Sequence, residues 1–126
     1  MQSVLRRPFL RRFCTITDSR FESLATAELE SIADLVDAQI SDKETVDGSV
    51  ELHDGVMTLD FCSPEKGTFV INKHTASQQI WYSSPVSAPA YFSIANSDWV
   101  SKRLGMNLRS KLSLDVEKLV KIRLDL

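Results

Sequence analysis

The sequence predicts an α+β fold, a two-layer α-β sandwich in which two terminal helices pack on one face of a mostly antiparallel sheet of five to seven strands. Three observations predict it. Apolar residues recur at helical spacing near both ends of the chain. Between these segments lie short runs that alternate apolar and polar residues and are separated by turns, as in a meander that two amphipathic helices can cover. The length of 126 residues and the apolar share of 43% suit one domain with one modest core.

The first 17 residues differ from the rest in charge, because they hold four arginines and no acid precedes Asp18. The arginines are Arg6, Arg7, Arg11 and Arg12. An arginine-rich, acid-free start is typical of a mitochondrial presequence. We therefore divide the chain into a targeting presequence at 1–17 and a folded domain at 18–126, and expect the mitochondrial matrix as its location. The alternative is a basic tail that binds acidic partners.

Two classes of partner are disfavoured by composition. Without its arginine-rich start the protein is acidic, which argues against nucleic acid as a partner. No apolar run approaches the roughly 20 residues that a membrane-spanning helix needs, so no membrane partner is expected either.

The segment 19–40 is predicted to form the first helix, with Asp18 or Ser19 as its N-terminal cap. The face opposite its apolar side carries three acids: Glu30, Asp34 and Asp37. Like charges at this spacing repel each other, and no intervening base relieves the repulsion. The stripe therefore either serves a function or is a solvated face kept acidic for solubility. Glu28 falls nearer the apolar face and is a weaker candidate.

Charge divides the folded part of the chain into two halves. From Phe21 to Glu65 the only strong base is Lys43, whereas from Lys66 to Leu126 nine Lys and Arg residues stand against four acids. We expect the fold to be an electrostatic dipole. Exposed carboxylates with water can bind hard or borderline divalent cations, but an open ridge should hold them weakly and exchangeably.

Two strands are expected at 49–52 and 56–61, joined by an Asp-Gly turn that supplies the positive φ of a tight hairpin. Cys62 follows the second strand and is expected to be a small buried residue. Because Cys14 and Cys62 are far apart and lack a C-x-x-C partner, neither a disulfide framework nor a thiolate zinc site is indicated.

The segment 67–85, GTFVINKHTASQQIWYSSP, is predicted to form the central hairpin, with a polar turn at 74–77. Strand alternation places one set of side chains in the core: Phe69, Ile71, Ile80 and Tyr82. It places a large aromatic among amides on the opposite face: Asn72, Gln79 and Trp81. Such a face indicates a surface built for contact. The alternative is that Trp81 is an ordinary core residue.

Beyond the hairpin, strands are expected at 91–94 and 99–102, followed by a break at Gly105. Asn107 can cap a closing helix. Catalytic motifs are sparse, since the two histidines, His53 and His74, stand alone, without a nucleophile elbow or a glycine-rich phosphate loop. Neither histidine has the preceding Glu of ferritin-type iron sites.

The central hairpin also carries a resemblance to a known family. G-T-F-V-I-N-K, then Q-I-W, then S-S-P at this spacing resembles the hairpin of the frataxins, mitochondrial iron-binding proteins of iron-sulfur cluster assembly. F-E-S-L-A, D-G-V-M-T-L and S-D-W-V extend the similarity from Phe21 towards the C-terminus. The resemblance implies an α-β sandwich. The chain departs from the family pattern at Thr26 and Ala27, where acids are common, at His74, where glutamine is common, and at Tyr91, where a base is common.

The resemblance implies a function and a set of site residues. Weakly bound iron, as Fe2+ or Fe3+, would sit on an acidic ridge: Glu22, Glu30, Asp34, Asp37, Asp42 and Asp47. A cysteine desulfurase and the iron-sulfur scaffold protein would be contacted by a second set: Asn72, His74, Gln79 and Trp81. The expected form is a monomer, with an iron-dependent oligomer as the alternative.

Two functions follow from this resemblance, and a third is the plainer alternative to them. The first is a non-catalytic activator of iron-sulfur cluster assembly that accelerates sulfur transfer, supplies ferrous iron, or does both. The second is a ferroxidase that oxidises Fe2+ to Fe3+ at the ridge. The third is an acidic protein-binding module whose iron affinity is incidental.

Overall fold

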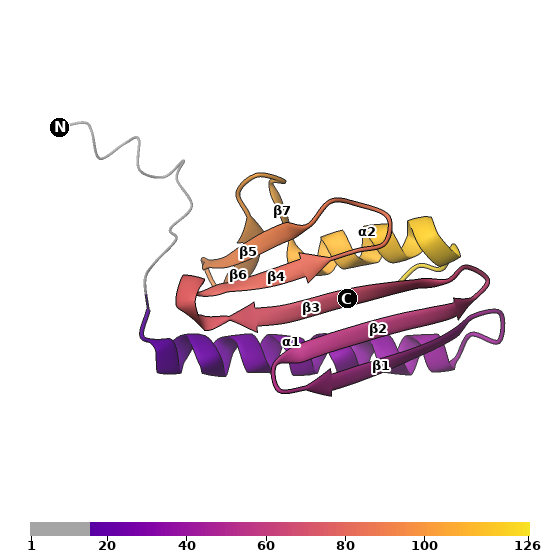
Figure 1. Cartoon of the computed structure of the whole chain (residues 1–126), viewed down its shortest axis with the longest axis horizontal. Helices are drawn as coiled ribbons and strands as arrows, with labels where there is room; N and C mark the ends of the chain where they lie inside the picture. Colours follow the sequence, from indigo (N-terminus) through magenta and orange to yellow (C-terminus); the bar gives the residue numbers. More distant parts are fainter. Residues whose placement is uncertain (1–15) are drawn as a thin grey trace.

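The computed structural model describes residues 16–126, so most of the predicted presequence lies outside the described residues. Two helices lie along one face of a seven-stranded sheet whose strands follow one another in chain order, each antiparallel to its neighbour (Figure 1). The elements are α1 (Asp18–Ser41), β1 (Asp47–His53), β2 (Val56–Ser63), β3 (Gly67–His74), the 3-10 turn η2 (Thr75–Ser77), β4 (Gln79–Ser83), β5 (Ala90–Ala95), β6 (Asp98–Ser101), β7 (Met106–Asn107) and α2 (Leu108–Val120). The predicted fold class is confirmed.

Several local details differ from the sequence-based expectations. The cap of α1 is Thr17, whose side chain accepts a hydrogen bond from the backbone N–H of Arg20, so the proposed caps Asp18 and Ser19 were wrong. Cys62 is exposed rather than buried, because it follows the buried Phe61 on β2 and strand alternation therefore turns it to the face that the helices leave open. The two-residue strand β7, which follows Gly105, was missed. No helix within residues 16–126 combines the length and apolarity needed to cross a membrane.

The core lies between the sheet and the two helices. Aromatic rings meet edge to face or tilted across neighbouring strands: Phe61 with Phe69, Phe69 with Tyr82, and Tyr82 with Phe92. Phe21 of α1 meets Trp99 of β6 in the same way, with ring centroids 5.8 Å apart. The predicted core face of the hairpin is confirmed, because its four residues are all buried: Phe69, Ile71, Ile80 and Tyr82.

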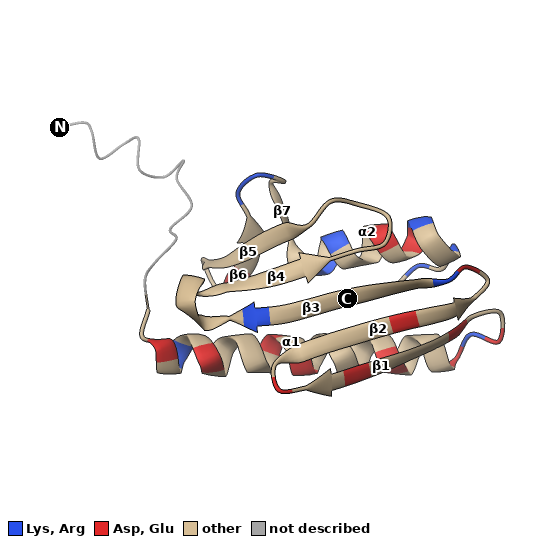
Figure 2. Ribbon diagram, viewed as in Figure 1, with Lys and Arg blue, Asp and Glu red and all other residues tan. Residues whose placement is uncertain are grey.

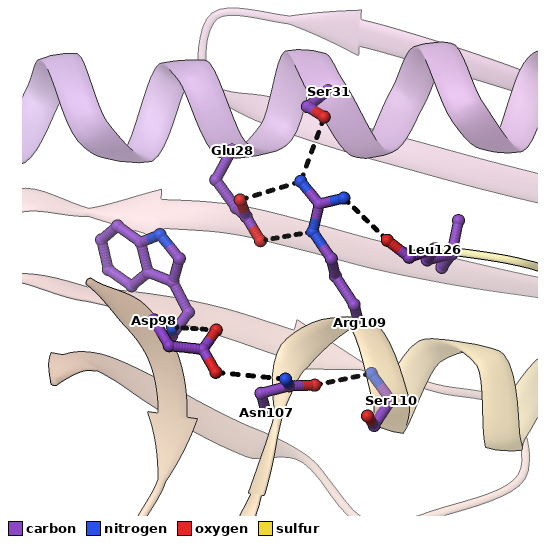
Figure 3. A network of polar contacts seen from close by, with 8 residues as sticks. Glu28, Ser31, Asp98, Asn107, Arg109, Ser110 and Leu126 are labelled. Carbon is purple, nitrogen blue, oxygen red and sulfur yellow. Dashed lines mark hydrogen bonds and ion pairs between the residues drawn. The ribbon is translucent and has the colours of Figure 1, made fainter. Parts of the chain in front are cut away.

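An arginine joins the two helices to the C-terminal residue (Figure 3). Both Nε and Nη2 of Arg109 donate to the carboxylate of Glu28 over 3.0 Å, and Nη2 also donates to Ser31. Nη1 of Arg109 donates to the backbone oxygen of Leu126. Such two-pronged contacts are among the stronger hydrogen bonds of proteins. Glu28 is therefore engaged in the fold, as its place near the apolar face suggested.

The start of α2 is capped as the sequence predicts. Oδ1 of Asn107 accepts from the backbone N–H of Ser110 over 2.9 Å, while its Nδ2 donates to Asp98 (Figure 3). Asp98 also accepts from the backbone N–H of Trp99. This chain of hydrogen bonds fixes the end of the sheet against α2.

A buried carboxylate joins the central hairpin to α2. Asp115 is fully buried and accepts hydrogen bonds from Tyr82 (2.5 Å), Ser87 (2.7 Å) and Lys111 (3.4 Å). Burial acts to raise the pKa of Asp115, but the hydrogen bonds from Tyr82 and Ser87 and the charge of Lys111 outweigh it, and the pKa lies below its ordinary value. Burial and the bond to Asp115 raise the pKa of Tyr82 far above its usual range.

Replacing Tyr82→Phe is expected to lower the free energy of unfolding by about 2 kcal/mol at pH 7, because a buried carboxylate loses one charge-assisted hydrogen bond. Urea denaturation measures the change. Tyr91→Phe is the matched control, since Tyr91 is 48% exposed and its change should stay within about 0.5 kcal/mol. A group with a lowered pKa stabilises the fold above its ordinary pKa and loses this effect as the pH falls through the folded-state value. The deficit of the Tyr82 variant should therefore shrink in acid.

Candidate functional site

Trp81 lies on the face of the sheet that the helices leave open. Asn72 of β3 and Tyr91 of β5 are its direct partners across the neighbouring strands, so the three side chains form a row. The ring of His74 stacks on Trp81, with centroids 3.8 Å apart and an interplanar angle of 14°. Tyr91 meets the indole edge to face at 5.5 Å, and Nε1 of Trp81 donates to Gln79 over 3.2 Å. The indole is therefore held in one orientation before any partner arrives.

The structure brings together all four residues that were predicted to contact a partner: Asn72, His74, Gln79 and Trp81. Two further residues extend this surface and were missed. Tyr91 is one, and Val56, which lies opposite Asn72 on β2 and is exposed, is the other. Alternation could have placed both, because Tyr91 precedes the buried Phe92 and Val56 precedes the buried Met57. We call the six residues the docking surface.

The acidic stripe of α1 lies beside the edge strand β1. Glu30, Asp34 and Asp37 are exposed and line a shallow surface depression, together with Ala33 and two apolar residues of β1, Val50 and Leu52. In Figure 2 most acidic residues lie on α1, β1 and β2, whereas basic residues lie on β3, at the turn after β6 and on α2, which carries acids as well. The electrostatic division that the sequence indicated is thus present in the fold.

The remaining predicted metal ligands are more scattered. Asp42 follows the end of α1 and Asp47 begins β1, and both are exposed. Within residues 16–126 no three His, Cys, Asp or Glu side chains converge as a chelating group. The exposed acids form an open line of oxygen donors, which suits weak and exchangeable binding of a hard cation that keeps most of its waters.

Glu22 differs from the other predicted ligands. Its two carboxylate oxygens accept hydrogen bonds from Lys73 of β3 and from Thr75 of η2. Lys73 also donates to Thr26 on α1 over 3.0 Å. The bond from Lys73, followed by that from Thr75, lowers the pKa of Glu22. Glu22 is therefore tied to the central hairpin, whereas the stripe of Glu30, Asp34 and Asp37 is open to solvent.

Replacing the stripe together, as Glu30→Gln, Asp34→Asn and Asp37→Asn, is expected to raise the free energy of unfolding by about 0.5 kcal/mol at low salt. The change removes like-charge pairs at helical spacing and an anion near the negative end of the helix dipole. Urea denaturation at several salt concentrations measures it, and the gain should shrink as salt increases. A loss of stability would mean that the stripe supports the fold rather than a ligand.

Comparison with known proteins gives one family. The family model of the frataxin-like domain matches residues 14–122. The mitochondrial frataxin homolog of Saccharomyces cerevisiae is 48% identical over 71 residues, which are 56% of this chain and 40% of the yeast protein. Mitochondrial frataxin of Dictyostelium discoideum is 36% identical over 109 residues, which are 84% of this chain and 55% of that protein. The matched regions thus span about half the length of these relatives.

Solved structures agree with this result. A trimeric frataxin from the yeast Saccharomyces cerevisiae, complexed with ferrous iron, superposes with a TM-score of 0.68 and 32% identity. The match covers 97% of this chain and 99% of the yeast chain. The similarity therefore extends over both helices and the whole sheet.

Proposed function

This chain belongs to the frataxin family, and from that premise we propose that it is a mitochondrial iron-binding protein that promotes iron-sulfur cluster assembly. It docks on the complex of a cysteine desulfurase with its scaffold protein, where it accelerates sulfur transfer, supplies ferrous iron, or does both. Relatives named as mitochondrial and a yeast relative complexed with ferrous iron support the location and the ligand. The arginine-rich residues 1–17 support import into the matrix as a cleaved presequence.

The observation that carries the docking role is the orientation of Trp81 on an uncovered sheet face. A half-buried indole, stacked on His74 and bordered by Tyr91, is a large apolar group that is already ordered. Binding energy at protein interfaces concentrates in such aromatic anchors, and ordering them beforehand reduces the entropy lost on association. Amide side chains beside the ring, Asn72 and Gln79, supply hydrogen-bonding groups that fix its partner's orientation.

The acidic stripe gives the protein a second functional surface. It lies on α1 beside β1, whereas Trp81 lies on β4, so the two surfaces occupy different parts of the molecule (Figure 1). The exposed carboxylates of Glu30, Asp34 and Asp37 can carry ferrous iron as cargo or face a basic patch of the desulfurase. In this proposal the side chains bind and orient, and the chemistry of sulfur transfer belongs to the partner enzyme.

The working form is proposed to be a monomer, because the docking surface and the stripe are both parts of one chain. Two yeast frataxin structures are trimeric, one with the full-length N-terminus and one complexed with ferrous iron, and they support an oligomer as the alternative. Sedimentation of the mature protein with and without ferrous iron distinguishes the two forms.

Replacing Trp81→Ala is expected to weaken binding to the desulfurase-scaffold complex by about 2 kcal/mol, or about 30-fold in Kd, because it removes a central aromatic anchor. Binding is measured by calorimetry, and activation by sulfide production with and without an iron chelator. Leu114→Ala is the control, since Leu114 is 42% exposed on α2, in the helical layer. Unchanged affinity of a folded Trp81 variant would contradict the docking role.

Neutralising Glu30, Asp34 and Asp37 together is expected to remove most of the ferrous iron that the protein binds in an anaerobic titration, because the three open carboxylates are lost. The control carries the same change in net charge at other exposed acids, as Glu65→Gln, Glu117→Gln and Asp125→Asn. Oxygen uptake with ferrous iron tests the ferroxidase alternative. Iron-dependent uptake that disappears in the stripe variant, while complex binding stays intact, would favour that alternative.

A further inference from the structure

The turn that carries His74 is tied to the start of α1 by several side chains. Lys73 and Thr75, which flank His74 in the sequence, both donate to Glu22. Lys73 also donates to the hydroxyl of Thr26, one helical turn further along α1. Strand alternation explains the arrangement, because Lys73 points to the helical layer while His74 points to the open face.

A second set of bonds holds the other side of the same turn. Gln78 has a left-handed backbone, with φ of 53°, and its side chain reaches the residues before α1. Its Oε1 accepts from the backbone N–H of Ile16 over 3.3 Å, and its Nε2 donates to the backbone oxygen of Ile16 over 2.6 Å. Nε2 also donates to Asp18 over 3.1 Å. The turn is thus bonded to α1 on both sides of η2.

The side chain of Lys73 is packed beside Glu22. Its side chain is only 21% exposed. The turn between β1 and β2 packs on it so closely that a Cβ at Gly55 would lie 2.5 Å from its Cε, and its backbone N–H donates to the oxygen of Gly55. The ammonium group therefore lies beside Glu22, against the turn between β1 and β2.

These contacts make Glu22 a poor ligand for iron, although the family resemblance implies that role. Each of its carboxylate oxygens already accepts a hydrogen bond, and one of the two donors is a cation that would repel a second positive charge. A metal ion would have to displace Lys73, which would then lose its partner. Glu30 and Asp34, which are exposed further along α1, meet no such competition.

We propose that Glu22 is a positioning residue of the docking surface rather than an iron ligand, an inference that rests on the proposed function. Through Lys73 and Thr75 it fixes the backbone on both sides of His74, and His74 in turn holds the indole of Trp81 by stacking. Loosening the turn widens the range of orientations of Trp81 in the free protein. The protein then loses more entropy on docking.

The test compares Glu22→Gln with Glu30→Gln in the mature protein. Glu22→Gln is expected to shift the indole N–H resonance of Trp81, leave that of the buried Trp99 unchanged, and weaken binding to the desulfurase-scaffold complex about fivefold, the effect of one or two side-chain hydrogen bonds. Ferrous iron binding should stay within about twofold of wild type. Glu30→Gln should show the opposite pattern, with weaker iron binding and an unchanged Trp81 resonance.

Two further variants separate positioning from a general loss of stability. Thr75→Val removes the other donor to Glu22 and should shift the same resonance. Exchanging the charges, with Glu22→Lys and Lys73→Glu together, should restore both the resonance and the affinity, because the hydroxyls of Thr26 and Thr75 can either donate or accept. Urea denaturation of each variant identifies a merely destabilised fold, since a loss of affinity in a variant that is fully folded under the binding conditions does not come from unfolding.

The experiments distinguish a failure of the positioning role of Glu22 from a failure of the docking role of Trp81. If Glu22→Gln lowers iron binding and leaves the Trp81 resonance and the affinity unchanged, Glu22 is an iron ligand and the inference is wrong. If Trp81→Ala itself binds like wild type, the proposed docking role fails, and the Trp81 resonance of the Glu22 variant still decides whether Glu22 holds the turn.

Discussion

The pairing register of β3 with β4 is the constraint on which the rest of the structure depends. Ile71 lies opposite Tyr82, and Asn72 lies opposite Trp81. Because side chains alternate along a strand, a slip of one residue would expose Phe69 and Ile71 and turn Trp81 into the core. The aromatic contacts that cross the sheet on its covered face oppose such a slip. Core packing therefore decides which residues reach the open face.

The same strand, β4, is held from both of its faces. On the covered face Tyr82 donates to the buried Asp115 of α2, and on the open face its neighbour Trp81 stacks with His74. Ser87, in the loop after β4, bonds to the same carboxylate. A single anchor in the core thus fixes both the strand that presents Trp81 and the loop that follows it. Orientation of the docking surface is a product of the fold rather than of local contacts alone.

Alternation and helical periodicity made the fold, the core face of the hairpin and the place of Trp81 predictable from the sequence, because these patterns are local. Contacts between distant segments were not predictable. Lys73 lies on the covered side by alternation, but its partner Glu22 is 51 residues away in the sequence, and their contact depends on how α1 packs on the sheet. Glu28 and Arg109, 81 residues apart, are a similar case. Cys62 was misjudged although alternation predicts its exposure, because it directly follows Phe61, whose side chain faces the core.

The acids of α1 fall into two groups: those that form an ion pair and those that remain exposed without one. Glu22 and Glu28, from the acidic half of the sequence, are paired with Lys73 and Arg109 from the basic half. These pairs join α1 to the hairpin and to α2, so part of the charge division of the sequence is used to assemble the layers. No ion pair within residues 16–126 neutralises the stripe of Glu30, Asp34 and Asp37.

Because those three carboxylates stay exposed and mutually repelling, the charge that folding leaves uncompensated is concentrated beside β1. A cation or a basic partner relieves that repulsion when it binds there, whereas at Glu22 it would break a contact that the fold already makes. The same residue type on one helix thus has two opposite relations to a positively charged ligand, and position relative to the β3–β4 hairpin decides between them.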